Sequence, residues 1–361
     1  MYAIVCKDCH ILSGNDDGTI RLEVNIAPLH TMGTTIVDRD LTLLQQADHQ
    51  PVTLADYIYP AIQKQYVTIL TLEADVLADD DLEAVHQMRV SLRRLRSQIQ
   101  AFGSILDIPR VMGDKPIGKI ARILGKVRDL DVLQDHFKTY RVDLPDAEQI
   151  YLEKVAATIA KRRRKDILKV KLMLEERDYQ YFKLGLNNWL NNPQYMPTAQ
   201  VEIGSILPDL LLTVVGQVFL NPGWWFDLDL GLEPELAVTQ MLAIHGETLH
   251  SLRKQVKAIR YLMEMFPDRY PPRYREYLKD FKQIHQLFGN IQDNIVLDEF
   301  IRKALGKRAA TKLPTLYDRM ARSNYLNWQT WQPIQHRYRQ SSTKRELQLL
   351  LIQDIIHNLD G

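Results

Sequence analysis

Cysteine is nearly absent from this 361-residue chain, and both of its cysteines lie in one short segment. That segment reads CKDCH, with Cys6, Cys9 and His10; the spacing is that of a c-type haem attachment site and would also supply half of a zinc site. No second Cys-x-x-Cys is present, and five preceding residues leave no room for the export signal that haem attachment normally requires. We therefore expect two reduced thiols in a short strand of a hairpin whose turn is SGNDDG.

The chain also lacks a long uninterrupted hydrophobic run. The nearest candidate, SILPDLLLTVVGQVFL, is broken by Pro208 and Asp209. Sixteen glycines and sixteen prolines are too few for a low-complexity protein, and the N-terminus lacks the basic-then-apolar form of a secretion signal. We expect a cytoplasmic protein without membrane contact, whose 45% hydrophobic composition can form a large core.

A net charge of only +1 hides a strong segregation of charge along the chain. Residues 1–85 contain four Lys/Arg against fourteen Asp/Glu, whereas residues 86–126 contain nine Lys/Arg against two acids. Segment 161–171 contains seven Lys/Arg and one acid. A local excess is enough to create a local positive field, so the composition is compatible with a polyanionic ligand.

Two predicted helices carry the same basic stripe, and one constant separation in the sequence relates the two copies. The first stripe is His86, Arg89, Arg93 and Arg96; the second is His250, Arg253, Lys257 and Arg260. We call this separation, which is that between His86 and His250, the repeat offset. At about 100° per residue, each set falls within an arc of roughly 80° and extends ~15 Å along its helix. A duplicated stripe of this kind can hold a row of negative charges such as phosphates.

Each stripe borders an apolar face that is duplicated with the same repeat offset. The first face is Val85, Met88, Leu92, Leu95, Ile99 and Phe102; the second is Leu249, Leu252, Val256, Ile259, Met263 and Phe266. Charge that serves only solubility usually lies opposite the apolar face and alternates in sign. These stripes contain no acid, which favours a binding role over an ordinary solvated face.

Two further predicted helices are rich in cations. The helix after the first stripe carries Lys115, Lys119, Arg122 and Lys126 within about 60° of one another. Their counterparts at the repeat offset are Lys279, Gln283, Gln286 and Asn290, so we expect the N-terminal half to bind an anion more strongly. A long helix over about 147–186 adds Lys161, Arg162 and Lys165, either as ligand contacts or as a solvated face.

The boxes formed by these residues resemble those of a known family. His-x-x-Arg-Val-x-x-Arg-Arg-Leu-Arg is followed by Leu-Gly-x-x-Arg-Asp-Leu-Asp-Val-Leu, and a second, weaker pair of boxes follows in the same order. This arrangement resembles the CHAD domain, the conserved histidine α-helical domain, over about 53–330. The resemblance implies an all-α fold of two pseudo-symmetric four-helix halves around a basic central channel that binds inorganic polyphosphate, in a protein often found at polyphosphate granules.

The resemblance also implies which residues bind polyphosphate. Carried over by position, the first box adds Arg94 to its stripe and the second adds Tyr261; with the neighbouring cations, the expected set is His86, Arg89, Arg93, Arg94, Arg96, Lys115, Lys119, Arg122, Lys126, Lys161, Arg162, Lys165, His250, Arg253, Lys257, Arg260, Tyr261, Lys279 and Lys282. Asp129 and Asp293 are expected to orient arginines. Where the halves differ, Ala258 stands opposite Arg94 and Gln292 opposite Arg128.

The expected organisation has three parts. Residues 1–52 form an acidic extension, residues 53–330 form the domain with halves 53–192 and 200–330, and residues 331–361 form a helical tail. The extension is too short for the triphosphate tunnel to which some family members are fused. We therefore expect a binding protein that is not an enzyme, with no cofactor, no metal and no catalytic residue.

Two other functions are compatible with basic helices. A nucleic-acid-binding module would also use them, although recognition of bases usually adds exposed aromatic or amide side chains. An enzyme acting on phosphoanhydrides normally needs a metal held by clustered carboxylates or histidines, and the chain has neither a P-loop nor an HExxH motif. Polyphosphate binding is the preferred interpretation.

Overall fold

The structure, a computed structural model, describes residues 52–142, 144–229 and 231–353. All described residues belong to the compact unit Pro51–Gly361. Within the described ranges the regular structure is entirely helical, with two isolated β-bridges and no named strand. The all-α prediction is confirmed for these residues, and the predicted hairpin lies outside them.

The helices follow one another with short connections. Their bounds are α1 Leu54–Thr71, α2 Glu73–Ala78, α3 Leu82–Phe102, α4 Asp114–Arg141, α5 Asp146–Glu175, α6 Arg177–Asn191, α7 Ile203–Phe219, α8 Pro234–Met263, α9 Pro272–Leu305, α10 Ala309–Lys312, α11 Pro314–Arg339 and α12 Ser341–Gln353. The described residues also form three 3₁₀ segments, Arg110–Met112, Pro197–Gln200 and Pro222–Trp225.

Local sequence explains where the first helices begin. Thr53 is the N-cap of α1, and its side chain and that of Asp56 form a capping box. Asp81 caps α3 by accepting a hydrogen bond from the Glu83 amide at 2.8 Å. Acidic side chains at these positions also suit the positive end of the helix dipole.

The duplication extends further than the sequence boxes indicated. Helices α4 and α9 end at Arg141 and Leu305, α5 and α11 end at Glu175 and Arg339, and α6 and α12 begin at Arg177 and Ser341; each pair is separated by the repeat offset. Together with α3 and α8, and with α1 and α7 at the start of each half, five helices of one half match five of the other. The expected count of four helices per half is therefore too low.

The predicted C-terminal tail belongs to the second half. The expected boundary at residue 330 falls inside α11, and beyond it Trp331, Tyr338, Leu347 and Leu351 are all fully buried. Helix α12 is the counterpart of α6 and packs on α7 and α11. The tail contributes to the core because its apolar residues recur with helical spacing along α11 and α12.

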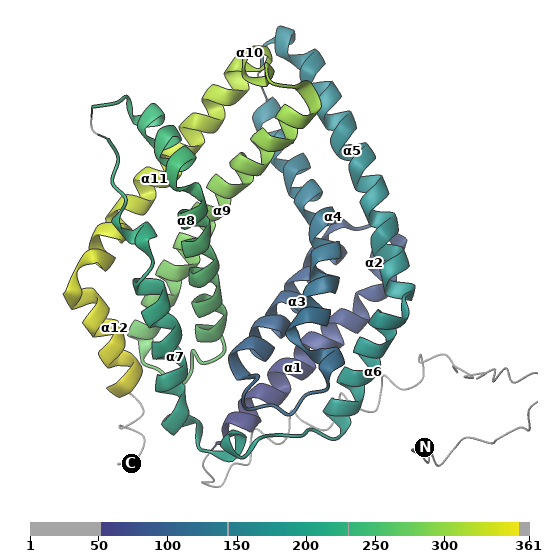
Figure 1. Cartoon of the computed structure of the whole chain (residues 1–361), viewed down its shortest axis with the longest axis vertical. Helices are drawn as coiled ribbons and strands as arrows, with labels where there is room; N and C mark the ends of the chain where they lie inside the picture. The colour runs from purple at the N-terminus through teal and green to yellow at the C-terminus, as the bar shows by residue number, and fades with distance from the viewer. Residues whose placement is uncertain (1–51, 143, 230, 354–361) are drawn as a thin grey trace, which may run out of the picture. The chain divides into compact units, whose positions relative to one another are not determined.

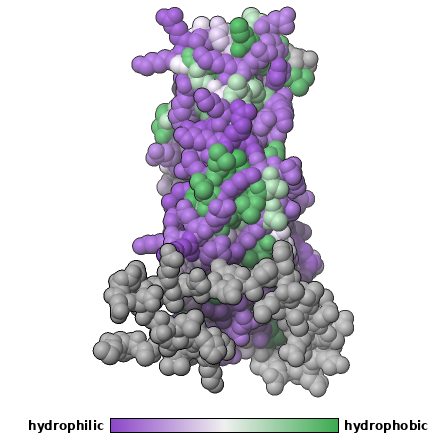
Figure 2. Space-filling model, turned by 90° about the vertical axis from the view of Figure 1, so that its right-hand side faces the viewer, coloured by the Kyte–Doolittle hydropathy of each residue, from purple (hydrophilic) through white to green (hydrophobic). Residues whose placement is uncertain are grey.

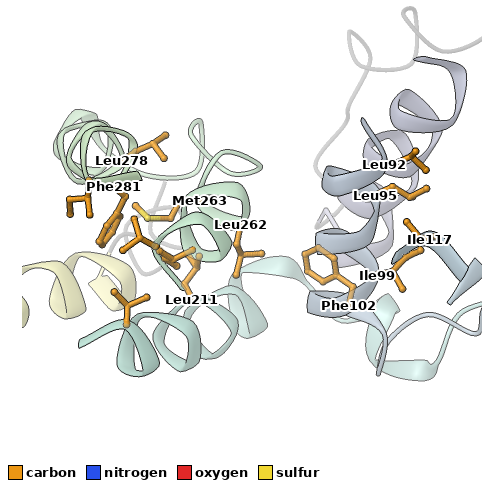
Figure 3. Close-up of a cluster of buried hydrophobic side chains, with 14 of the residues drawn as sticks. Leu92, Leu95, Ile99, Phe102, Ile117, Leu211, Leu262, Met263, Leu278 and Phe281 are labelled. Atoms are coloured by element: carbon orange, nitrogen blue, oxygen red, sulfur yellow. The ribbon is translucent and has the colours of Figure 1, made fainter. Parts of the chain in front are cut away.

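The apolar faces predicted from the sequence form the core of each half. Along α3, Val85, Met88, Leu92, Leu95 and Phe102 are fully buried. The matching positions on α8 are at most 3% exposed. Figure 3 shows the labelled side chains in two groups, one along α3 with Ile117 of α4 and the other among α7, α8 and α9.

The two halves of the unit Pro51–Gly361 place their matched helices face to face (Figure 1). Helices α3 and α4 lie opposite α8 and α9, while α5 and α6 lie outside the first pair and α11 and α12 outside the second. A second hydrophobic cluster joins α4 and α5 to α9 and α11, with Leu133, Val155, Leu297 and Leu316 at its centre. These contacts hold the halves together at one end.

Backbone hydrogen bonds join the halves near the starts of α1 and α7. The Leu54 amide donates to the Val201 carbonyl at 3.2 Å, and the Ile203 amide donates to the Val52 carbonyl at 3.0 Å. The hydrophobic cluster and these hydrogen bonds thus connect the two halves on either side of the contact between α3 and α8. The basic stripes of α3 and α8 lie between these two connections.

The outer face on the α5 side is mainly hydrophilic, with smaller hydrophobic patches (Figure 2). Leu168 and Leu172 of α5 are 60% and 61% exposed. Among the described residues, no helix is both long enough and apolar enough to span a membrane.

Truncation of Trp331 tests whether the end of the chain stabilises the fold. Its indole is fully buried and packs against Trp224 and Phe288, with ring centroids 5.0 and 4.9 Å away. We expect Trp331→Ala to lower the free energy of unfolding by about 3–5 kcal/mol because it leaves a large cavity. Chemical denaturation measures the change. The control is Leu220→Ala, whose side chain is 84% exposed; similar small losses in both variants would contradict this account.

Candidate functional site

The basic stripes of α3 and α8 approach each other at Tyr261. The Arg93 guanidinium of α3 donates a hydrogen bond of 3.1 Å to the Tyr261 hydroxyl of α8. The guanidinium carbons of Arg93 and Arg260 lie 5.8 and 4.4 Å from the centre of the same ring, within cation–π range. One buried phenol therefore contacts a predicted binding residue from each half.

Matched glycines let two stripe arginines lie against the neighbouring helices. A Cβ atom at Gly125 of α4 would lie 3.3 Å from Nε of Arg89. A Cβ at Gly289 of α9 would lie 3.5 Å from a terminal nitrogen of Arg253. A Cβ at Gly125 would require Arg89 to shift by a few tenths of an ångström, and a Cβ at Gly289 would lie in van der Waals contact with Arg253. The glycine of each sequence box thus leaves room for the arginine beside it.

Two matched carboxylates follow these glycines by one helical turn. Asp129 lies 3.6 Å from a terminal nitrogen of Arg89, so it can orient this arginine as expected. Asp293 lies 3.8 Å from Nε2 of His136, across the interface between α9 and α4. Burial raises the pKa of both carboxyl groups, with Arg89 and His136 acting in the opposite direction. The Asp129 side chain is still 62% exposed, so solvent reaches this carboxylate.

Lys257 is the most perturbed cation of the site. Burial, followed by the charges of Arg93, Arg253 and Arg89, lowers its pKa to about 7. Arg89 and Arg93 come from α3, whereas Lys257 and Arg253 come from α8. Cations of both stripes therefore lie close enough to repel one another. We call Arg89, Arg93, Arg253, Lys257, Arg260, Tyr261, Asp129, Asp293 and His285 the central cluster.

His285 of α9 was not among the residues expected from the sequence. Burial and the charges of Arg253, Arg260 and Arg93 lower its pKa to about 3, so it is uncharged at neutral pH. Its Nε2 atom is buried without a hydrogen-bond partner among the described residues. The matching residue of the first half is Ala121, so the repeat gives no signal for it. The spacing of four residues between His285, Gly289 and Asp293 places all three on one helical face, and this spacing could have identified His285 from the sequence.

The two histidines that begin the stripes are uncharged at neutral pH. Burial and then Arg128 lower the pKa of His86, and burial and then Lys254 lower the pKa of His250. An anionic ligand raises the pKa of an imidazole and burial lowers it, so the sequence alone leaves the protonation state of these histidines open. Within the protein itself, burial and the neighbouring cations decide the protonation state.

Several buried nitrogen atoms of the site lack protein partners. Nδ1 of His86 and of His250, and Nε of Arg253 and of Arg260, are buried with no hydrogen-bond partner among the described residues. Guanidinium groups are donors in every arrangement, so the two arginine atoms can each donate to an acceptor. Unpaired buried donors are costly, and an anionic oxygen would satisfy them.

Other predicted residues of the stripes lie at the edge of the central cluster. Arg96 forms a salt bridge with Asp114, with a nitrogen–oxygen distance of 2.6 Å. Its guanidinium lies over Gly118, where a Cβ would be 3.2 Å away. Arg94 is exposed and points to a different part of the surface from its neighbour Arg93.

A further set of cations, on α4, lies beside the face that carries Gly125 and Asp129. All four of its side chains are exposed: Lys115, Lys119, Arg122 and Lys126. The Lys119 ammonium is 2.7 Å from the Asp178 carboxylate of α6, which is a surface salt bridge of small energetic value. This set can extend the positive surface but does not contact the cluster.

The remaining predicted cations are not brought into the cluster. On α5, Lys161, Arg162 and Lys165 are exposed, and Arg162 pairs with Asp166 at 3.3 Å. On α9, Lys279 is exposed and Lys282 lies 3.5 Å from the Glu264 carboxylate. For the α5 cations the structure favours the solvated-face interpretation.

Among the described residues, no group of three or more histidine, cysteine, aspartate or glutamate side chains is placed to hold a metal ion. The only motif that suggested a metal, CKDCH, lies outside the described residues.

Comparisons with known proteins agree with the fold. The model of a family described as the CHAD domain matches residues 60–302. A CHAD domain from the plant Ricinus communis is similar in structure, with a TM-score of 0.55 and 19% identity over 85% of this chain and 94% of that one. PptA from Streptomyces chartreusis gives a TM-score of 0.49 and 13% identity over 78% of this chain and 100% of that one. A search of curated proteins found no significant match.

Replacement of Lys257 tests the electrostatic cost of the cluster. Its pKa of about 7 in the folded protein is below the value of about 10.4 for an unfolded lysine. At low pH the lysine is charged in both states, and the folded state bears the full cost of burying it. Between these two pKa values the folded protein releases the proton, so the cost disappears as the pH rises.

We therefore expect Lys257→Met to be more stable than the unaltered protein at about pH 6, and the difference to shrink by about pH 9.5. Denaturation midpoints at the two pH values measure it. A pH-independent difference would show that Lys257 is not the titrating group. Lys254→Met, at an exposed position of the same helix, is the control.

Proposed function

As this chain belongs to the CHAD domain family, we propose that its central cluster binds inorganic polyphosphate. The observation that carries the proposal is the meeting of two matched cationic stripes, seen in the hydrogen bond between Arg93 and Tyr261 and in the cations of both halves around Lys257. Like charges this close repel one another, and a bound anion would compensate that repulsion.

The chemistry of the cluster suits a linear phosphate polymer. Polyphosphate carries about one negative charge per unit and has no base to recognise, so it needs many donors in series. Arginine presents a planar fork to two oxygens, whereas lysine contributes a compact charge. The described stripes supply both, and they extend along α3 and α8 in matched registers.

Bound phosphate would also change the protonation of the site. Lys257 is only partly protonated at neutral pH, and a phosphate chain beside it would favour the charged form. Binding above pH 7 should therefore take up protons. We further propose that this interaction recruits the protein to polyphosphate granules.

Neutralising one matched arginine in each half tests the binding site. We expect Arg89→Gln with Arg253→Gln to weaken polyphosphate binding by about 100-fold or more, because each charged hydrogen bond is worth about 1.5–3 kcal/mol. Calorimetric titration with polyphosphate of defined length at two ionic strengths measures the affinity, and the salt dependence should become less steep. The control is Lys161→Gln with Lys165→Gln, which removes the same charge from exposed positions of α5.

Two outcomes would contradict this assignment. If the α5 variant loses as much affinity as the α3/α8 variant, binding follows net charge and not the cluster. If single-stranded RNA competes with polyphosphate at equal affinity and equal salt, a general nucleic-acid-binding surface explains the data better. Circular dichroism of each variant establishes that it is folded.

We propose that the protein binds polyphosphate without cleaving it. Incubation of the full chain with long-chain polyphosphate and Mg²⁺ or Mn²⁺ should leave the chain length unchanged on a gel, because the family resemblance supplies a binding fold and no catalytic module. Shortening of the polymer that is lost in the Arg89→Gln, Arg253→Gln variant would identify the central cluster as an active site instead.

A further inference from the structure

A cavity lies on the other side of the contact between α3 and α8 from the central cluster. It has a volume of about 490 Å³ and is lined by α1 and α3 on one side and by α7, α8 and Lys282 of α9 on the other. This volume is in the range of small-molecule sites. Tyr261 belongs to both regions, since it lines the cavity and accepts the hydrogen bond of Arg93.

The cavity lies where the matched positions of the two halves face each other. Its lining includes pairs separated by the repeat offset: Arg94 and Ala258, Ser97 and Tyr261, and Gln98 and Leu262. In each pair the residues differ in size or polarity. The halves thus share the backbone around the cavity but present different chemistry to it.

The wall formed by α1 and α3 carries buried amides. Gln65 and Gln98 are 5% and 7% exposed, and both line the cavity. Oε1 of Gln98 is buried with no hydrogen-bond partner among the described residues. An unpaired polar atom costs free energy, and rotation of the Gln98 amide would bring it to a hydrogen-bond donor of a ligand in the cavity.

The wall formed by α7 and α8 is largely apolar. Val214, Leu262 and Met265 supply aliphatic surface, and the small side chain of Ala258 leaves space opposite Arg94. The cations Lys64 and Arg94 are exposed beside this cavity and make no salt bridge with a described residue. Gln217 and the Glu264 carboxylate also line the cavity, and Glu264 pairs with Lys282 at 3.5 Å. The cavity therefore combines an amide wall, a partly apolar wall and the two cations Lys64 and Arg94 at its rim.

We propose that this cavity binds a nucleoside phosphate, with its base between the two walls and its phosphate at Arg94 and Lys64. A side-chain amide has a donor and an acceptor side by side, and glutamine pairs in this way with the edge of adenine. A bare phosphate chain offers acceptors only and has no flat apolar surface to cover Leu262 and Met265. The site lies beside the proposed polyphosphate site and shares Tyr261 with it, but it does not depend on polyphosphate binding.

Titration of the full chain with AMP and with ribose 5-phosphate tests base recognition. Both carry a phosphate monoester, but only AMP carries a base. We expect saturable binding of AMP. Ribose 5-phosphate should bind at least about tenfold more weakly, because it lacks the adenine that hydrogen-bonds to the glutamine amide. Isothermal calorimetry in the absence of polyphosphate measures both ligands.

Three variants test whether AMP binds in this cavity. Gln98→Leu removes the amide at nearly constant volume and should weaken AMP binding by about tenfold. Ala258→Phe fills the cavity from the opposite wall and should abolish AMP binding. The matched control is Arg89→Gln with Arg253→Gln, which should leave AMP binding unchanged.

Each result decides the proposal. Absence of saturable AMP binding overturns it, as does equal binding of ribose 5-phosphate and AMP. An affinity that falls in the Arg89, Arg253 variant but not in Gln98→Leu places the nucleotide in the central cluster and also overturns it. If Gln98→Leu does not fold, Ala258→Phe decides alone. AMP binding without polyphosphate binding would contradict the proposed function and leave this inference intact.

Discussion

The close approach of two positively charged helices is the constraint on which the rest of the structure depends. Burial and the arginines of both stripes lower the pKa of Lys257 of α8. Arg93 of α3 donates a hydrogen bond to Tyr261 of α8. Repulsion between α3 and α8 has to be opposed by contacts elsewhere. The structure supplies these on both sides of the stripes, as the hydrophobic cluster between α4 and α9 and the backbone hydrogen bonds between the starts of α1 and α7. The scaffold can therefore keep the cations together without relying on the ligand.

The carboxylates of the cluster orient cations but do not neutralise them. Asp129 lies 3.6 Å from Arg89 and is still largely exposed, and Asp293 faces His136. Burial raises the pKa of both acids, as it lowers the pKa of Lys257. Tight ion pairs such as Arg163 with Asp79 and Asp131 are found outside the cluster, where they join helices. This difference separates cations that hold the fold from cations that remain available to an anion.

Much of the fold and the centre of the site could be predicted from the sequence. Helical periodicity identified the apolar faces of α3 and α8, and the constant repeat offset matched the arginines, glycines and aspartates of the two halves. The same method missed the last part of the repeat, because α11 and α12 share the helix boundaries of α5 and α6 without sharing their sequence pattern. It also missed His285, since no counterpart exists, and it grouped Lys161 and Lys165 with the site. Periodicity shows which residues share a face of one helix, but not which helix that face meets.

Where the repeat is kept and where it is broken indicates what each region can bind. The kept positions, such as Gly125 with Gly289 and Asp129 with Asp293, surround the cationic stripes, and a repeated arrangement suits a ligand made of identical units. The broken positions, such as Gln98 with Leu262, line the cavity on the other side of the same two helices. Two different walls suit a ligand with two different faces, which a uniform polymer does not have. A duplicated fold can thus hold a symmetric binding site, the central cluster, beside an asymmetric one, the cavity. This is possible because substitutions on one face of α3 or α8 leave the opposite face unchanged.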